Sequence, residues 1–117
     1  MDSSLTTEKL LIKASEMELY DNLVRQLNKD FIRAGIAQEF HIEIKPKSLI
    51  RSLVAALYEL ITVDFEAYLN LLYVIDVPEK SVKALPEQRV DELAQSIAEL
   101  ILKREWQKVL FRQRHQK

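Results

Sequence analysis

The strongest constraint on the fold is the scarcity of helix breakers. The chain of 117 residues contains one glycine and three prolines, which are Gly35, Pro46, Pro78 and Pro86. Between these breakers, apolar residues recur every three or four positions, which is the period of an amphipathic helix. The sequence therefore predicts an all-α protein, a single domain over residues 1–117 that forms an antiparallel bundle of three long helices.

The first long helix is expected at about residues 6–34. Its apolar residues form one stripe, comprising Leu10, Ala14, Met17, Tyr20, Val24, Leu27, Phe31 and Ala34. Gly35 follows and is predicted to cap the helix, because glycine readily adopts the left-handed backbone that commonly ends one. The pattern from Ser15 to Glu18 resembles a capping box, which leaves a break near Ser15 open.

An extended connector is expected at residues 37–46, before a second long helix at about residues 48–75. Apolar and polar residues alternate in the connector, with one side formed by Phe40, Ile42 and Ile44. A single strand has no partner to pair with, so we expect this apolar side to lie against the helices. In the second helix an unbroken apolar stripe favours one continuous element, although β-branched residues before Asp64 leave a break there open.

A short extra turn is expected at about residues 77–84, before a third long helix at about residues 86–113. Asp76 is predicted to cap this turn, with Glu79 at its third helical position. The third helix carries two adjacent apolar stripes. Such a helix packs against two neighbours, or against one neighbour and a second subunit.

Composition excludes several classes of protein. The formal net charge of −1 means that no overall field attracts a polyanion. The absence of cysteine excludes disulfides, thiolate metal sites and cysteine nucleophiles. The first residues lack the pattern of a signal peptide, and the longest apolar run without a charge, residues 67–75, is far below the roughly 20 residues needed to span a bilayer. We therefore expect a soluble, cytoplasmic protein.

No pattern of catalytic residues is found. One glycine is too few for the usual phosphate-binding loops, and the two histidines lack the spacing of a metal-binding motif. His41 lies between Glu39 and Glu43, an arrangement that we interpret as the solvated side of the connector rather than a metal site. We therefore expect no enzyme activity, no cofactor, no metal and no small-molecule substrate.

The C-terminal segment carries a basic stripe. Arg104, Lys108 and Arg112 follow one another at helical spacing beside the apolar Trp106, and together these four residues form a possible interaction face. Such a stripe can meet phosphates or anionic lipid, but cations near the end of a helix also complement its dipole. Antiparallel packing of the second and third helices would place Arg104 opposite Glu59.

Two segments resemble a family of small, uncharacterised, all-helical bacterial proteins. YLNLLYVIDVPEKSV and LAQSIAELILKREWQKV match its pattern of LLY-x-IDV-x-E followed by a closing helix that ends in RE-x-QKV. The resemblance covers about half of the chain, from Tyr68 to Val109, and draws attention to Tyr73, Asp76, Glu79, Arg104 and Glu105. It implies a cytoplasmic bacterial protein and brings no known activity.

These patterns favour a non-enzymatic interaction or structural module. The surplus of apolar residues on the second and third helices predicts a homodimer, or a complex with a protein partner. The alternative is a nucleic-acid-binding accessory protein that uses the basic stripe. No known nucleic-acid-binding module accompanies the stripe, which makes this the second choice.

Overall fold

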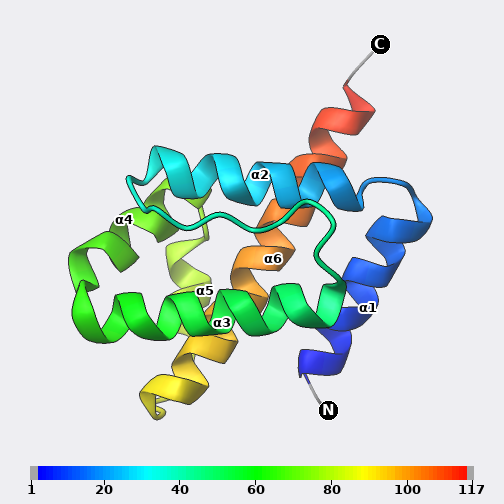
Figure 1. Cartoon of the computed structure of the whole chain (residues 1–117). Helices are drawn as coiled ribbons and strands as arrows, with labels where there is room; N and C mark the ends of the chain where they lie inside the picture. Colours follow the sequence, from blue (N-terminus) through cyan, green and yellow to red (C-terminus); the bar gives the residue numbers. More distant parts are fainter. Residues whose placement is uncertain (1–2, 116–117) are drawn as a thin grey trace.

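Six helices make up the computed structural model, which describes residues 3–115 (Figure 1). They are α1 (Ser3–Glu16), α2 (Tyr20–Arg33), α3 (Pro46–Val63), α4 (Phe65–Ile75), α5 (Glu79–Lys83) and α6 (Val90–Arg114). No strand forms among the described residues, so the expected all-helical class is confirmed. The radius of gyration of 13.6 Å is close to the about 13 Å expected for a compact chain of this length. In the range that the structure covers, no helix is both long and apolar enough to cross a bilayer.

One continuous first helix over residues 6–34 does not form, because the chain turns between α1 and α2. The break near Ser15, which the sequence left open, is the alternative that the structure shows. Glu18 adopts a left-handed backbone with φ of 59°. Its amide donates to the Ser15 carbonyl at 3.0 Å, and the Leu19 amide donates to the Ala14 carbonyl at 2.8 Å. This is a Schellman motif. Since it forms around a glutamate, no glycine or proline in the sequence announces it.

The prediction of one continuous second helix over residues 48–75 is also wrong, and the break falls at Asp64. The Asp64 carboxylate accepts a hydrogen bond from the Ala67 amide at 3.2 Å and so caps α4. Just before the break, the Thr62 hydroxyl donates back to the Tyr58 carbonyl at 2.9 Å. The break was the open alternative in the sequence.

Asp76 ends α4 instead of starting the next helix. Its backbone is left-handed, with φ of 70°, and the Val77 amide donates to the Leu72 carbonyl at 3.1 Å. Aspartate tolerates this conformation better than most residues, which explains a second Schellman motif without glycine. Pro78 precedes α5, and Glu79 is the first residue of that helix rather than the third.

Gly35 ends α2 in the way that its isolation in the sequence predicts. Its φ is 77°, its amide donates to the Ile32 carbonyl at 2.9 Å, and the Ile36 amide donates to the Phe31 carbonyl at 3.0 Å. Here the same motif does use glycine. The last helix, in contrast, starts at Val90 rather than at residue 86, because the Glu92 carboxylate accepts from the Arg89 amide at 3.1 Å and caps it there.

The connector after α2 lies against that helix. Phe40 is buried, and its amide and carbonyl bond to the Asn28 side chain at 2.7 Å and 2.8 Å. The Tyr20 hydroxyl donates to the Ile44 carbonyl at 2.6 Å. Ile42 and Ile44 are half-buried against the core. The segment thus satisfies part of its backbone with side chains of α2, which explains how an isolated extended segment remains ordered.

α6 is the central helix, and all five other helices pack against it. In Figure 1 it crosses behind α2 and α3, and its last turns project beyond them. Its buried residues are Ala94, Ile97, Ala98, Ile101, Leu102, Glu105, Trp106 and Val109. The wide apolar arc seen in the sequence is therefore covered within one chain, which leaves its two stripes little surface for a second subunit.

Glu18 and Gly35 allow a matched test of the helix ends. Glu18→Gly removes a side chain from left-handed backbone and should raise the free energy of unfolding by up to about 1 kcal/mol. Gly35→Ala should lower the free energy of unfolding by about 1 kcal/mol. The added Cβ meets no atom within 4 Å, so the cost comes only from holding alanine in left-handed backbone. Urea denaturation followed by circular dichroism measures both.

Glu16→Gly is the control, because Glu16 has helical backbone in the last turn of α1. Glycine there should lower the free energy of unfolding by roughly 0.5–1 kcal/mol. A similar decrease in Glu18→Gly would contradict the left-handed turn between α1 and α2.

Candidate functional site

Arg104, the first residue of the predicted basic stripe, is bound to the end of α4. Its Nη2 lies 3.0 Å from Asp76 Oδ2, and its Nε donates to the Asp76 carbonyl at 2.9 Å. A cation at this position also complements the C-terminal end of the α4 dipole. The predicted pairing of Arg104 with Glu59 is wrong, because the break at Asp64 turns the chain and brings Asp76 to Arg104 instead.

The other three residues of the predicted face lie in different environments. Trp106 is buried in the core. The Lys108 side chain is mostly buried and reaches two acidic residues. Arg112 is exposed, and no carboxylate of the described residues lies within 4.0 Å of it. The structure therefore neutralises two of the three cations of the stripe and leaves one available.

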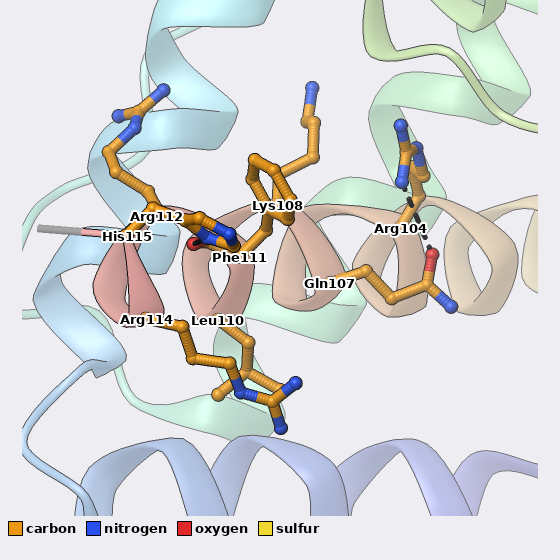
Figure 2. Close-up of a pocket in the computed structure, with 8 residues that line it drawn as sticks. All are labelled: Arg104, Gln107, Lys108, Leu110, Phe111, Arg112, Arg114 and His115. Atoms are coloured by element: carbon orange, nitrogen blue, oxygen red, sulfur yellow. Dashed lines mark hydrogen bonds between the residues drawn. The ribbon is translucent and has the colours of Figure 1, made fainter.

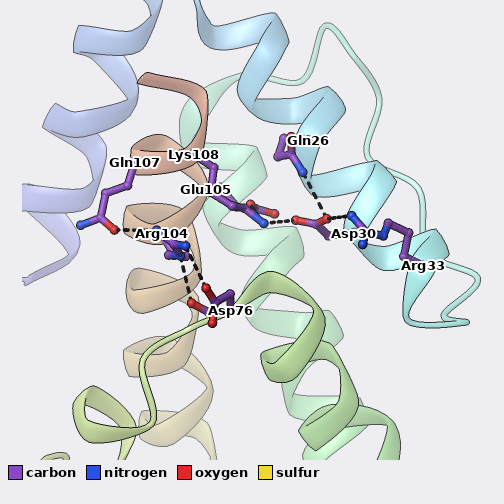
Figure 3. Close-up of polar contacts among 8 residues, drawn as sticks. All are labelled: Gln26, Asp30, Arg33, Asp76, Arg104, Glu105, Gln107 and Lys108. Atoms are coloured by element: carbon purple, nitrogen blue, oxygen red, sulfur yellow. Dashed lines mark hydrogen bonds and ion pairs between the residues drawn. The ribbon is translucent and has the colours of Figure 1, made fainter. Parts of the chain in front are cut away.

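A buried polar cluster joins α2 to α6, and we define it as Gln26, Asp30, Glu105 and Lys108 (Figure 3). The side chains of Asp30 and Glu105 are fully buried. Lys108 Nζ lies 2.6 Å from Asp30 Oδ2 and 3.0 Å from Glu105 Oε1. Gln26 Nε2 donates to Asp30 Oδ1 at 3.1 Å. The hydrogen bond of Lys108 goes to Asp30, and neither Glu105 oxygen accepts a well-aligned hydrogen bond.

The two acids of the cluster differ in their affinity for a proton. Burial, followed by the hydrogen bond with Asp30 and the charge of Asp30, raises the pKa of Glu105 to about 8. Burial alone would also raise the pKa of Asp30, but hydrogen bonds from Glu105, Lys108 and Gln26 outweigh it and lower that pKa. The raised pKa favours the protonated, neutral form of Glu105 at pH 7, which leaves the Asp30 carboxylate to balance the charge of Lys108.

A pair of acids that share a proton is the arrangement used for general acid and base catalysis. Such a group must come within about 3 Å of the substrate atom that it protonates. The side chains of Asp30 and Glu105 have no exposed surface in this conformation, so neither contacts a molecule in solution. Among the described residues, no group of three or more His, Cys, Asp or Glu side chains could hold a metal ion. The geometry is that of a packing contact between α2 and α6.

The sequence interpretation missed Asp30, and it singled out Glu105 only through the family resemblance, without assigning it a role. Asp30 directly precedes Phe31 of the apolar stripe and lies three residues after Leu27. Glu105 lies four residues after Ile101 and four before Val109, both of which are buried. An acid at core spacing in two different helices was the available signal, and together with Lys108 it predicts a buried ion pair.

A hollow in the surface lies around the projecting turns of α6 (Figure 2). It has a volume of about 850 Å³, and every residue that lines it belongs to α6 or directly follows it. Phe111 is exposed there and packs on the His115 ring, with centroids 4.2 Å apart. Because one helix supplies all of the walls, this hollow is open surface rather than an enclosed binding site.

Comparisons with models of known families, with curated proteins and with solved structures give no significant match. Two surfaces stand out by their own geometry. One is a set of apolar side chains exposed on α4, and the other is a set of basic side chains exposed on α2 and α6.

The buried polar cluster predicts how stability depends on pH. Glu105 binds its proton more tightly in the folded than in the unfolded chain, so its contribution is complete below the unfolded pKa and is lost as pH rises toward about 8. Between about pH 5 and about pH 8, the free energy of unfolding should fall by up to about 3 kcal/mol. Glu105→Gln should remove most of this decrease, as measured by urea denaturation at several pH values.

Glu87→Gln is the control, because Glu87 is exposed and its replacement should leave the dependence of the free energy of unfolding on pH unchanged. If wild type and Glu105→Gln had the same profile between about pH 5 and about pH 8, Glu105 would not be protonated in the folded chain.

Asp30 affects stability in acid. Because its pKa is lowered in the folded chain, its contribution to the free energy of unfolding is lost as pH falls below about 4.

Proposed function

We propose that this protein is a non-enzymatic interaction module that pairs with a second copy through the outer face of α4. This face consists of Phe65, Leu69 and Tyr73, whose exposed fractions are 52%, 49% and 84%. They follow one another every four residues and so form one stripe about 12 Å long. Three large exposed apolar side chains in one row on a short helix are typical of a protein–protein interface, whereas isolated exposed apolar residues occur on most protein surfaces.

The distribution of covered and exposed apolar residues supports this choice of face. The third predicted helix corresponds to α6, and the other helices cover its apolar stripes. The connector covers part of α2. Single apolar residues such as Ile32 and Phe111 are also exposed on other helices, but α4 is where three of them follow one another in a row. Phe65 lies four residues after Ile61 in the apolar stripe of the second predicted helix, so the sequence placed its ring in the core. The break at Asp64 changes the phase of the helix and turns this ring outward.

The spacing of the three residues suits a two-fold axis. If two α4 helices cross antiparallel with Leu69 on the axis, Phe65 of each copy lies beside Tyr73 of the other. Aromatic pairs of this kind contribute about 0.5–1.5 kcal/mol beyond their buried area. A two-fold arrangement uses the same patch twice, which is the commonest symmetry of small homo-oligomers.

A groove beside the stripe can receive a side chain of the second copy. It lies between α4 and α5, has a volume of about 490 Å³, and its apolar walls include Leu72, Val77, Pro78 and Val82. Leu69 and Tyr73 also line it. Asp76, Glu79 and Lys83 complete its lining. The groove has room for the phenyl ring of Phe65 from a second copy, which would pack on the apolar part of its wall.

The alternative function, nucleic-acid binding through the basic stripe of α6, has less support in its original form. Arg104 and Lys108 are held in ion pairs with Asp76 and Asp30. Breaking either pair to reach a phosphate would leave a carboxylate without its partner. Only Arg112 of the stripe is exposed without such a pair among the described residues.

The pairing predicts a concentration-dependent mass. Light scattering on the wild-type chain at micromolar concentrations should give twice the 13.7 kDa of one copy, falling toward 13.7 kDa on dilution. Leu69→Glu would place two like charges on the two-fold axis, where they lose water, and should weaken pairing by at least about tenfold.

Ile12→Glu is the control, since Ile12 is exposed by 45% on α1, which does not contact α4. It should leave the mass unchanged, and circular dichroism should show both variants folded. A wild-type mass of 13.7 kDa at every concentration would refute self-association. A dimer that persists in Leu69→Glu would place the interface on another face.

A further inference from the structure

A second groove lies between α2 and α6, and its charged walls are all basic. It has a volume of about 340 Å³ and is lined on one side by Arg25 and Lys29 and on the other by Arg112. Asn22 and Gln113 add amide groups, and no acidic residue of the described chain lines it. Two helices that are far apart in sequence thus bring three cations to one site.

These three cations are available to a ligand. All of them are exposed, and no carboxylate in the described part of the chain lies within 4.0 Å of any of them. The acid that shares their helix face, Asp21, makes no ion pair with Arg25 four residues later. Arg104 and Lys108 differ in this respect, since the fold itself neutralises both.

The basic surface continues along α2. Arg25, Lys29 and Arg33 are spaced by four residues, so they form a row about 12 Å long. Arg25 and Lys29 also line a groove of about 750 Å³ on the other side of α2, which contains one acid, Glu39. Arg33 lies 3.9 Å from the buried Asp30 and remains mostly exposed. The row is therefore flanked by a groove on each side.

We propose that the groove between α2 and α6, together with this row, binds the phosphate backbone of a nucleic acid. Guanidinium groups bind phosphate oxygens in pairs of hydrogen bonds, and amides such as those of Asn22 and Gln113 donate to phosphate and sugar. A single phosphate ion could not contact the full length of the row, whereas a strand presents phosphates repeatedly. No aromatic side chain of the described residues lines the groove, so the contacts are to the backbone and independent of base sequence.

The site differs from the basic stripe expected in the sequence. Of that stripe it keeps Arg112 and replaces the two ion-paired cations with Arg25 and Lys29. Figure 2 shows Arg112 and Arg114 pointing to opposite sides of α6, which agrees with Arg112 rather than Arg114 lining the groove. The inference is independent of pairing through α4, because it uses none of the residues of that face.

The test compares two triple variants of the full chain. Arg25→Gln, Lys29→Gln and Arg112→Gln together remove the groove cations, whereas Lys9→Gln, Lys13→Gln and Lys80→Gln remove the same charge from exposed positions on α1 and α5. Fluorescence anisotropy would measure binding to duplex DNA and to single-stranded RNA of about 20 nucleotides at about 50 mM and about 200 mM salt.

The groove variant should bind at least about tenfold more weakly than wild type at the lower salt concentration. Its plot of log affinity against log salt concentration should also become shallower, by about one for each phosphate that the removed cations had neutralised. The control variant should stay within about threefold of wild type. Equally weakened binding in both variants, or no wild-type binding at the lower salt concentration, would overturn the proposal. Tighter binding to polyglutamate than to either nucleic acid would overturn it in favour of an acidic protein partner.

Discussion

The apolar surface of α6 is the constraint on which the rest of the structure depends. It covers so much of the helix that five other helices pack against it, and each fully buried large side chain contributes about 1.5–3 kcal/mol. Two straight helices of the predicted length would touch α6 only along single lines. The turns at Glu18 and Asp64 let the chain change direction and surround α6, so these breaks serve the burial of one central element.

The buried polar cluster then fixes how α2 lies on α6. Asp30 has its charge balanced only where Lys108 stands 2.6 Å away. If α2 slid along α6 by a turn, Asp30 would keep Gln26 and Arg33 of its own helix but would lose the ion pair with Lys108, and breaking a buried ion pair costs several kcal/mol. Apolar contacts alone tolerate such a shift far better. The raised pKa of Glu105 belongs to the same arrangement, since a second ionised carboxylate beside Asp30 would leave one negative charge uncompensated in the core.

The sequence predicted the features that follow from the spacing of apolar residues. It missed features that depend on the backbone conformation of single residues or on ion pairs between helices. Helical spacing and the isolated Gly35 indicated the all-α class and the end of α2, and alternation at Phe40 indicated the connector. The turns at Glu18 and Asp76 use left-handed residues other than glycine, so their composition resembles that of a helix. The apolar stripe also continues past Asp64, so the sequence favoured one helix and left the break there as the second choice. Asp30 and Glu105 look like any solvated acid until α2 and α6 are brought together, and the candidate groove needs the same contact.

The surfaces open to a partner follow from what α6 leaves uncovered. Most of its apolar residues are buried in the core, and α4, which contacts α6 less extensively than α3 does, keeps an exposed apolar row. The basic residues of α6 likewise fall into two groups, those that form ion pairs within the fold and those that stay exposed. Arg104 and Lys108 hold neighbouring helices and cancel nearby carboxylates, whereas Arg112 is exposed and lines the groove beside α2. A basic surface can form there only because α2 lies alongside and adds Arg25 and Lys29, so the contact that sets the core also assembles the groove.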